Sequence, residues 1–252
     1  MDYNPFPSTV ISDWEFLDTV DGRSACPLCG KSRKYFCYTC LIALPQIADR
    51  IPKVKLPVTV DIIKHPNEID GKSTSCHAAV LAPDDVRVFT YPCIPDYDPH
   101  KDLASDVAKT ENSTSTDLVI GKKRCNEQTL QTGDQTELPS KHPKLSLKVP
   151  FEKVVLIDST WNQTRNIAND ERLKNLTKVE LKSQNTNFWR HQEGIPSTYL
   201  STIEAIYYFM RDFHLFFLET KYDHEYDNLL FFFCFMYNKI QSSQKKAKKK
   251  KD

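Results

Sequence analysis

The sequence predicts an α/β protein, a sheet flanked by helices, with a small cysteine-rich module in front of it. The first observation is a run of four apolar residues at 154–157 that stops abruptly at Asp158, the pattern of a short buried strand. The second is a pair of broad apolar stripes at helical spacing, in residues 203–217 and 229–240, which suits helices packed on a sheet. The third is a set of four cysteines in two close pairs near the N-terminus.

The composition is that of a globular protein. Of the 252 residues, 40% are hydrophobic and 27% are charged, enough for one large domain with a well-buried core. The net charge of +1 is unevenly distributed, because residues 245–252 carry six lysines and one aspartate and the rest of the chain sums to −4. A nucleic-acid partner would therefore have to be bound by local basic patches and this tail.

The N-terminal residues 1–20 lack the basic start and apolar run of a signal peptide. The most apolar stretches, 200–218 and 229–237, are interrupted by charges or too short to cross a bilayer. We expect a soluble, monomeric, intracellular protein with no membrane contact. The lysine tail predicts either a nuclear localisation signal or a phosphate-binding arm, so the expected location is the nucleus, with the cytoplasm as a second site.

The clustered cysteines form the strongest spacing pattern in the chain. Two C-x2-C pairs separated by seven residues are typical of paired knuckles that present four thiolates to one tetrahedral zinc. The alternative is reduced free thiols. Four sulfur ligands leave no open position, so the zinc would be structural and not catalytic. The predicted ligands are Cys26, Cys29, Cys37 and Cys40.

Basic and aromatic side chains accompany this module, among them Arg33, Lys34, Tyr35 and Tyr38. Such side chains suit binding to the backbone and bases of RNA. Ordinary solvated surface explains them equally well. Arg33 and Lys34 are therefore candidate RNA contacts.

Residues 56–64 predict a strand of the main sheet, and Lys64, His65 and Glu68 lie at or just past its end. For His65 the commoner alternative is a hydrogen-bonded histidine in a turn. A hydroxyl-rich turn then leads to a predicted short helix at 76–81, and a further strand is predicted at residues 86–91.

A second set of polar side chains follows the apolar run at 154–157, with Asp158, Ser159 and Thr160 beside the flat ring of Trp161. Ligands of open α/β sheets bind at the carboxyl ends of strands, so we expect this strand end and that of residues 56–64 to face one crevice. The alternative is that Asp158 or Ser159 only caps a helix over residues 161–176.

Segment 96–147 loses apolar periodicity, and its only candidate strand is the weak stretch 117–121. We expect most of it to be a disordered insertion with basic clusters. Beyond the Asp158 block, residues 179–182 predict another strand.

Residues 187–211 place Arg190 and His191 among aromatics and then begin an apolar helix at Leu200, Ser201, Thr202 and Glu204. The unpaired backbone amides at such a helix start could hold a carboxylate or a phosphate. The aromatic residues of this helix and of the next one are expected to pack in the core.

Two blocks, Asp158-Ser-Thr-Trp161 and Leu200-Ser-Thr-Ile-Glu-Ala205, closely resemble the DTW-domain family. The resemblance extends to the cysteine pairs and to Lys64-His-Pro-Asn-Glu68, so it covers roughly residues 23–96 and 150–240. Family members are tRNA-uridine aminocarboxypropyltransferases, and this version is most similar to the eukaryotic branch. The resemblance implies a SPOUT-like sheet, mixed and flanked by helices, with a C-terminal trefoil knot.

The resemblance also divides the chain. It implies an N-terminal extension (1–22), a zinc knuckle (23–45), a catalytic domain in two parts (46–96 and 148–242), an insertion (97–147) and a basic tail (243–252).

The implied donor is S-adenosylmethionine and the implied acceptor is tRNA. Asp158 would act as the general base at the uridine imino nitrogen or hold the base edge, with Thr160 beside it and Trp161 stacked on uracil or adenine. Arg190 would pair with the carboxylate of the donor. The remaining donor contacts are implied at Ser159, Leu200, Ser201, Thr202 and Glu204, and the RNA contacts at Lys64, His65, Arg33 and Lys34.

A second function stays open. Family members usually place one more strand between the Lys64 block and the Asp158 block, and segment 97–147 does not show it clearly. The alternative is therefore a tRNA-binding protein of the same fold with impaired catalysis. A third interpretation, a zinc-stabilised protein-interaction domain, predicts no affinity for tRNA.

Overall fold

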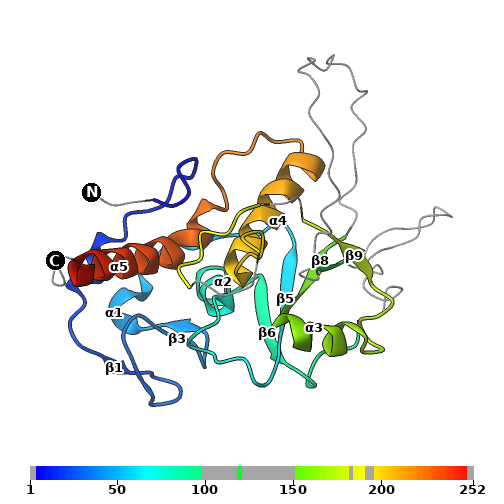
Figure 1. Cartoon of the computed structure of the whole chain (residues 1–252), viewed down its shortest axis with the longest axis horizontal. Coiled ribbons are helices and arrows are strands. Elements are labelled where there is room, and N and C mark those ends of the chain that lie inside the picture. The colour runs from blue at the N-terminus through cyan, green and yellow to red at the C-terminus, as the bar shows by residue number, and fades with distance from the viewer. Residues whose placement is uncertain (1–3, 98–117, 121–150, 182–183, 191–195, 249–252) are drawn as a thin grey trace.

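The computed structural model describes residues 4–97, 118–120, 151–181, 184–190 and 196–248 (Figure 1). A five-stranded sheet forms the centre of the molecule, and the cysteine-rich module lies beside it, near helix α5. None of the helices within these ranges is long and apolar enough to span a membrane.

The strands lie in the order β6-β5-β8-β7-β9, and every pairing is parallel. The prediction of a mixed sheet is therefore wrong for the described strands. The reason is that β5 connects to β6, and β8 to β9, through a helix, and such crossovers return the chain in the same direction. The strands are β5 (Thr59–Lys64), β6 (Val86–Thr90), β7 (Leu118–Ile120), β8 (Lys153–Asp158) and β9 (Thr177–Val179).

Strand β7 comes from the segment that the sequence predicts to be largely without regular structure. Its three residues pair with Val154–Leu156 of β8 on one side and with β9 on the other. The weak candidate strand at 117–121 is thus confirmed as part of the sheet. The rest of the predicted insertion, from residue 98 onward, lies outside the described residues.

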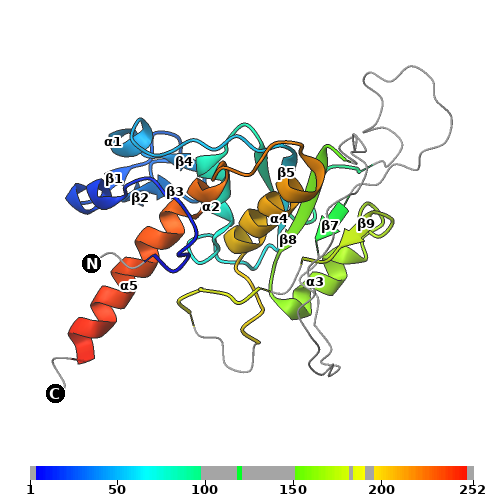
Figure 2. The same ribbon diagram turned by 90° about the horizontal axis from the view of Figure 1, so that it is seen from above.

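Helices cover both faces of the sheet (Figure 2). Successive side chains of β8 point to opposite faces of the sheet. Val154 and Leu156 belong to the larger core beneath α2, α4 and α5. Val155 and Ile157 belong to a smaller core beneath α3. The helices are α2 (Ser75–Leu81), α3 (Trp161–Ala168), α4 (Thr202–Phe217) and α5 (Phe231–Lys248), with α5 following the short 3-10 helix η2 (Asp227–Leu230).

Most predicted elements are confirmed, and three boundaries differ. Helix α3 ends at Ala168 and is followed by turns up to Leu176, where a longer helix was predicted. Strand β9 covers Thr177–Val179, so it begins two residues before the predicted stretch 179–182 and shares only Val179 with it. Helix α5 continues through Lys248, so the first part of the basic tail is helical. Its aromatic residues are core residues as predicted, with Phe231, Phe232 and Phe233 fully buried.

The N-terminal residues join the main core. The cysteine-rich module consists of α1 (Pro45–Ala48) and two small antiparallel sheets of two strands each. The first pairs β1 (Ser24–Ala25) with β2 (Ser32–Arg33), and the second pairs β3 (Phe36–Cys37) with β4 (Ile42–Ala43). Phe36 of this module packs on Phe232 of α5, with ring centroids 4.7 Å apart, and on His77 of α2 at 5.5 Å. Before the module, Phe6 packs on Phe233 at 5.4 Å, and η1 (Glu15–Thr19) buries Leu17.

Candidate active site at the ends of β5 and β8

The ends of the two central strands lie side by side, as the sequence predicts. Lys64, the last residue of β5, is the register partner of Asp158, the last residue of β8. The chain after β5 stays close, because the His65 amide donates a 3.0 Å hydrogen bond to the Asp158 carbonyl. The polar residues after both strands therefore share one edge of the sheet.

The Asp158 carboxylate is buried, 5% exposed, and accepts a hydrogen bond at each oxygen. Ser73 donates to Oδ2 at 2.5 Å from the turn before α2, and Thr202 donates to Oδ1 at 2.6 Å from the first residue of α4. Asp158 thereby ties together three segments that are far apart in the sequence.

Thr74 makes a second link to the start of α4. Its hydroxyl accepts a 3.1 Å hydrogen bond from the amide of Ile203. The sequence suggested that the amides at this helix start could hold an anion. The amide of Ile203 instead donates its hydrogen bond to Thr74. The hydroxyl-rich turn of residues 73–75 thus positions the helix.

Glu204 closes a capping box at the same helix start. Its fully buried carboxylate accepts hydrogen bonds from the amide and hydroxyl of Ser201, at 2.8 and 2.7 Å. It also accepts from the Thr186 hydroxyl and the Asn187 amide, both at 2.7 Å. All four donors belong to the protein, so in this structure Glu204 anchors the loop that carries Trp189 and Arg190.

The side chains past β5 have local partners. Lys64 forms an ion pair with Asp70, and the ring Nδ1 of His65 accepts a 3.1 Å hydrogen bond from the Asn67 amide. The latter is the turn arrangement that was the alternative for His65. Both residues are partly exposed at the edge of the sheet.

The side chains past β8 differ in exposure. Ser159 is buried and shares a 2.8 Å hydrogen bond with the hydroxyl of Thr164 one turn into α3. Thr160 is exposed and is the N-cap residue of α3. The predicted stacking of Trp161 concerns a side chain outside the described residues. Leu200 is buried just before α4.

Arg190 contacts the turn of residues 71–74. Its Nη1 donates a 3.2 Å hydrogen bond to the Lys72 carbonyl, and its guanidinium carbon lies 5.8 Å from the Phe188 ring centroid. The side chain is exposed, so its remaining donors can reach a ligand. His191 lies outside the described residues.

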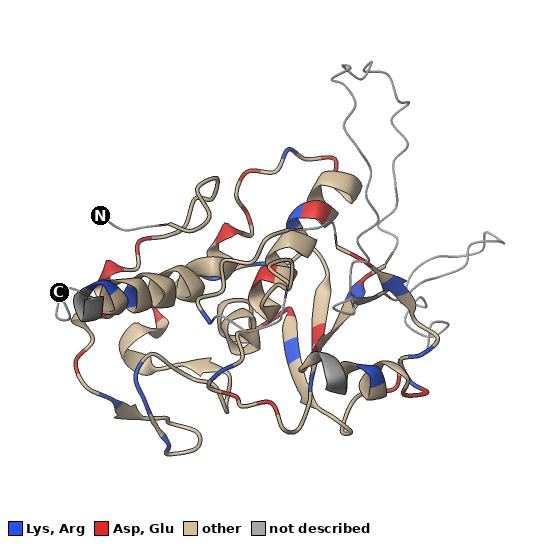
Figure 3. Cartoon of the chain, in the orientation of Figure 1, with Lys and Arg blue, Asp and Glu red and all other residues tan. Residues whose placement is uncertain are grey.

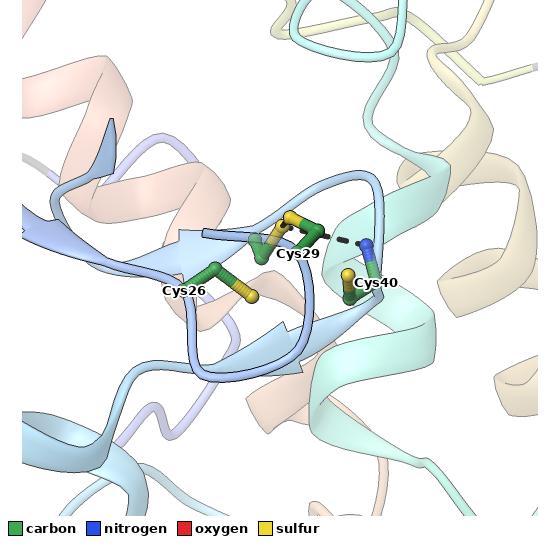
Figure 4. A group of neighbouring side chains, drawn as sticks. Cys26, Cys29 and Cys40 are labelled. Atoms are coloured by element: carbon green, nitrogen blue, oxygen red, sulfur yellow. Dashed lines mark hydrogen bonds between the residues drawn. The ribbon is translucent and has the colours of Figure 1, made fainter. Parts of the chain in front are cut away.

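The sulfur atoms of Cys26, Cys29, Cys37 and Cys40 all lie within 4.8 Å of one another. Figure 4 shows three of them converging from the two knuckle turns. Cys29 and Cys37 are 3.6 Å apart between sulfurs. Tetrahedral zinc with bonds of about 2.3 Å requires roughly 3.8 Å between sulfurs, so the cluster fits such an ion.

The environment of Cys37 favours its thiolate. Burial opposes this charge, but hydrogen bonds from the amides of Cys40 and Thr39, with contacts from the Cys26 and Cys29 thiols, lower the pKa of Cys37 to about 6. Contact with the Cys29 thiol, then burial, raises the pKa of Cys40 to about 12. A cation among the sulfurs would favour the thiolate form of all four.

Four residues of the site were not assigned from the sequence, namely Ser73, Thr74, Thr186 and Asn187. The hydroxyl-rich turn before α2 was visible as a pattern, but nothing in it indicated a partner 85 residues away. The loop residues Thr186 and Asn187 carry no local signal at all, because their role depends on the buried carboxylate of Glu204.

Residues 34–241 match the DTW domain family. The chain is 48% identical to tRNA-uridine aminocarboxypropyltransferase 1 of Xenopus laevis, over 90% of this chain and 84% of that protein. It is 44% identical to the protein of the same name in Mus musculus, over 98% and 88%, and 42% identical to that of Homo sapiens, over 96% and 85%. No solved structure gives a significant match.

Proposed function

The chain belongs to the DTW-domain family, and from this we propose that it transfers the 3-amino-3-carboxypropyl group of S-adenosylmethionine to the imino nitrogen of a uridine in tRNA. In this reaction the imino nitrogen loses its proton to a base and attacks the γ-carbon of the methionine arm. The carbon–sulfur bond breaks, and its electron pair leaves on methylthioadenosine. The chain must therefore orient the amino-acid arm of the donor, and not its methyl group, toward the base.

One observation carries this proposal. The family signature at Asp158 and the block at Leu200–Ala205 meet through the hydrogen bond from Thr202 to Asp158, although 44 residues separate them. Parallel β-strands direct their carboxyl ends to the same edge, where ligands of such sheets bind. The presence of β7 beside β8 weighs against the alternative of a binding protein that has lost a central strand.

The geometry suggests a positioning role for Asp158. Both of its oxygens already accept hydroxyl hydrogen bonds, and the side chain is nearly excluded from solvent. We propose that it fixes the turn of Ser73 and the start of α4 around the reacting groups. A direct role as general base would require the uridine proton to reach a lone pair that the two hydroxyls leave free, on a carboxylate that is nearly excluded from solvent.

We propose zinc as the resident metal of the cysteine cluster, because four sulfurs at this spacing suit tetrahedral coordination. The ion would hold the module in the shape that packs Phe36 against α5. We further propose the SPOUT-related knotted topology that the family resemblance implies. Parts of the chain that would decide it, including residues 121–150 and 191–195, lie outside the described residues.

The test is transfer of label from S-adenosylmethionine, carried in the aminocarboxypropyl arm, to unmodified tRNA transcripts. The wild-type chain is expected to label tRNA, and donor labelled only in the methyl group is the control that should give none. Label from the methyl donor would indicate a methyltransferase. No label from either donor, with tRNA binding intact, would favour the binding protein.

A further inference from the structure

A cavity of about 370 Å³ lies between the cysteine-rich module, the turn of residues 71–74, the Trp189–Arg190 segment and α5. The module and the turn approach closely, since a Cβ at Gly71 would lie 3.4 Å from the Tyr38 ring. Ser73 and Thr74 line the cavity, and these two residues hold Asp158 and the start of α4. The cavity therefore adjoins the candidate active site.

The lining of the cavity is strongly basic. Five cationic side chains contribute to it, and no carboxylate lines it among the described residues. Figure 3 shows that the chain as a whole mixes both signs of charge, so this concentration is local. A ligand of the cavity is therefore expected to be an anion. The five are Arg23, Arg33, Lys34, Lys72 and Arg190.

Arg33 is the most strongly constrained of these cations. It is only 7% exposed, and its guanidinium carbon lies 3.9 Å from the centroid of the Tyr38 ring. Its Nη1 donates to the Ser32 carbonyl at 3.0 Å and its Nη2 to the Thr39 hydroxyl at 3.2 Å. Its Nε is buried without a hydrogen-bond partner among the described residues. Because a buried donor without a partner is costly, this N–H indicates a missing acceptor.

His77 contributes a second buried polar atom without a hydrogen-bond partner among the described residues. This atom is its Nδ1, and the residue, which belongs to α2, lines the cavity and is 5% exposed. Tyr35, Tyr38 and Trp189 add aromatic surface to the lining. Phosphate-binding cations next to aromatic rings are the combination by which proteins hold single-stranded RNA.

We propose that this cavity binds one nucleotide of the tRNA loop, with its phosphate among the cations and its base against the aromatic rings. The cysteine-rich module would then form one wall of the RNA site and would not only stabilise the fold. This inference rests on the proposed function, because it takes tRNA as the substrate. S-adenosylmethionine is a poor match, since its sulfonium and ammonium outweigh its single carboxylate.

The experiment measures binding of an unmodified tRNA transcript by fluorescence anisotropy between 50 and 200 mM salt, without donor. The double variant Lys34→Ala/Lys72→Ala removes two cations from the cavity. The matched control, Lys31→Ala/Lys53→Ala, removes two exposed lysines that do not line it. We expect about tenfold weaker binding for the cavity variant, with a salt slope lower by roughly 1 to 2, and a change of less than about twofold for the control.

Two further measurements complete the test. Arg33→Lys keeps the charge but loses the rigid fork, so it should also weaken tRNA binding, while its zinc content should equal that of the wild type. Affinity for S-adenosylmethionine should be unchanged in every variant. Equal tRNA affinity of the cavity and control variants, or loss of donor affinity in the cavity variant, would overturn the proposal. Wild-type binding of tRNA without transfer would instead refute the proposed function and leave the cavity intact.

Discussion

The hydroxyl of Thr202, the first residue of α4, donates a 2.6 Å hydrogen bond to Asp158, the last residue of β8. Both residues are buried, and the same carboxylate accepts from Ser73. A helix start, a strand end and a turn are therefore fixed relative to one another by one carboxyl group. Disturbing any of the three partners should displace the others.

Thr202→Val tests this link, because valine keeps the shape of threonine and removes the hydroxyl. We expect a loss of about 1–3 kcal/mol in the free energy of unfolding, since one oxygen of a buried carboxylate is left without its donor. Transfer activity should fall by at least about tenfold. Urea unfolding and label transfer measure the two effects. The control is Thr90→Val, at an exposed threonine ending β6, which should change neither.

Asp158→Asn separates the positioning role from the role of general base. Asparagine can still form hydrogen bonds to both hydroxyls, because a hydroxyl can donate to its carbonyl oxygen or accept from its NH2 group. It cannot take a proton at neutral pH. If Asp158 positions the site, the variant should keep measurable transfer, with the pH dependence of kcat unchanged. Complete loss of transfer in a variant that folds and binds both substrates would instead assign Asp158 as the base.

Glu204→Gln should loosen the loop that carries Trp189 and Arg190. The amide group of glutamine is a donor, and two of the groups facing Glu204 are backbone amides that can only donate. We expect a loss of about 2–3 kcal/mol in unfolding free energy and faster hydrogen exchange at residues 186–190. Glu180→Gln, at an exposed site, is the control. Equal stability of the two variants would contradict the anchoring role.

Removal of the metal should destabilise more than the cysteine-rich module, because Phe36 packs on both α2 and α5. Cys37→Ser is expected to abolish binding of one zinc per chain and to cost on the order of 4 kcal/mol. Elemental analysis and thermal unfolding check this. Cys93→Ser alters an exposed cysteine outside the cluster and should leave both unchanged. Full stability of the wild-type chain after chelation would exclude a structural role for the metal.

The sequence was sufficient for the parts of the fold that depend on local patterns. Periodicity located β5, β8 and α4, and spacing located the cysteine cluster, because each signal lies within a few residues. Strand β7 was weakly visible, since three apolar residues in a polar segment become a strand only by pairing with β8 and β9. The parallel direction of the strands and the hydrogen bonds that Asp158 and Glu204 accept depend on contacts between residues far apart in the sequence. No local pattern predicts such contacts.

The pH dependence of stability should contain a contribution from His77. Burial lowers the pKa of this histidine from 6.5 to about 3, because the charged ring would lose its water and lie against the rings of Phe36 and Phe232. Between these two values the unfolded chain binds a proton that the folded chain does not. The stability is therefore complete above about pH 6.5 and decreases as the pH falls toward 3, by up to about 1.4 kcal/mol per pH unit.

His77→Phe keeps an aromatic ring in this position and cannot titrate. In urea titrations between pH 7 and 5, the variant should lose less stability than the wild type, with a difference of roughly 1–2 kcal/mol at pH 5. His65→Phe, at a partly exposed histidine, is the control. Parallel curves for the wild type and His77→Phe would show that His77 takes up its proton in the folded chain as well. A protonated ring requires an acceptor or water within reach, so this outcome would place His77 in contact with the contents of the cavity.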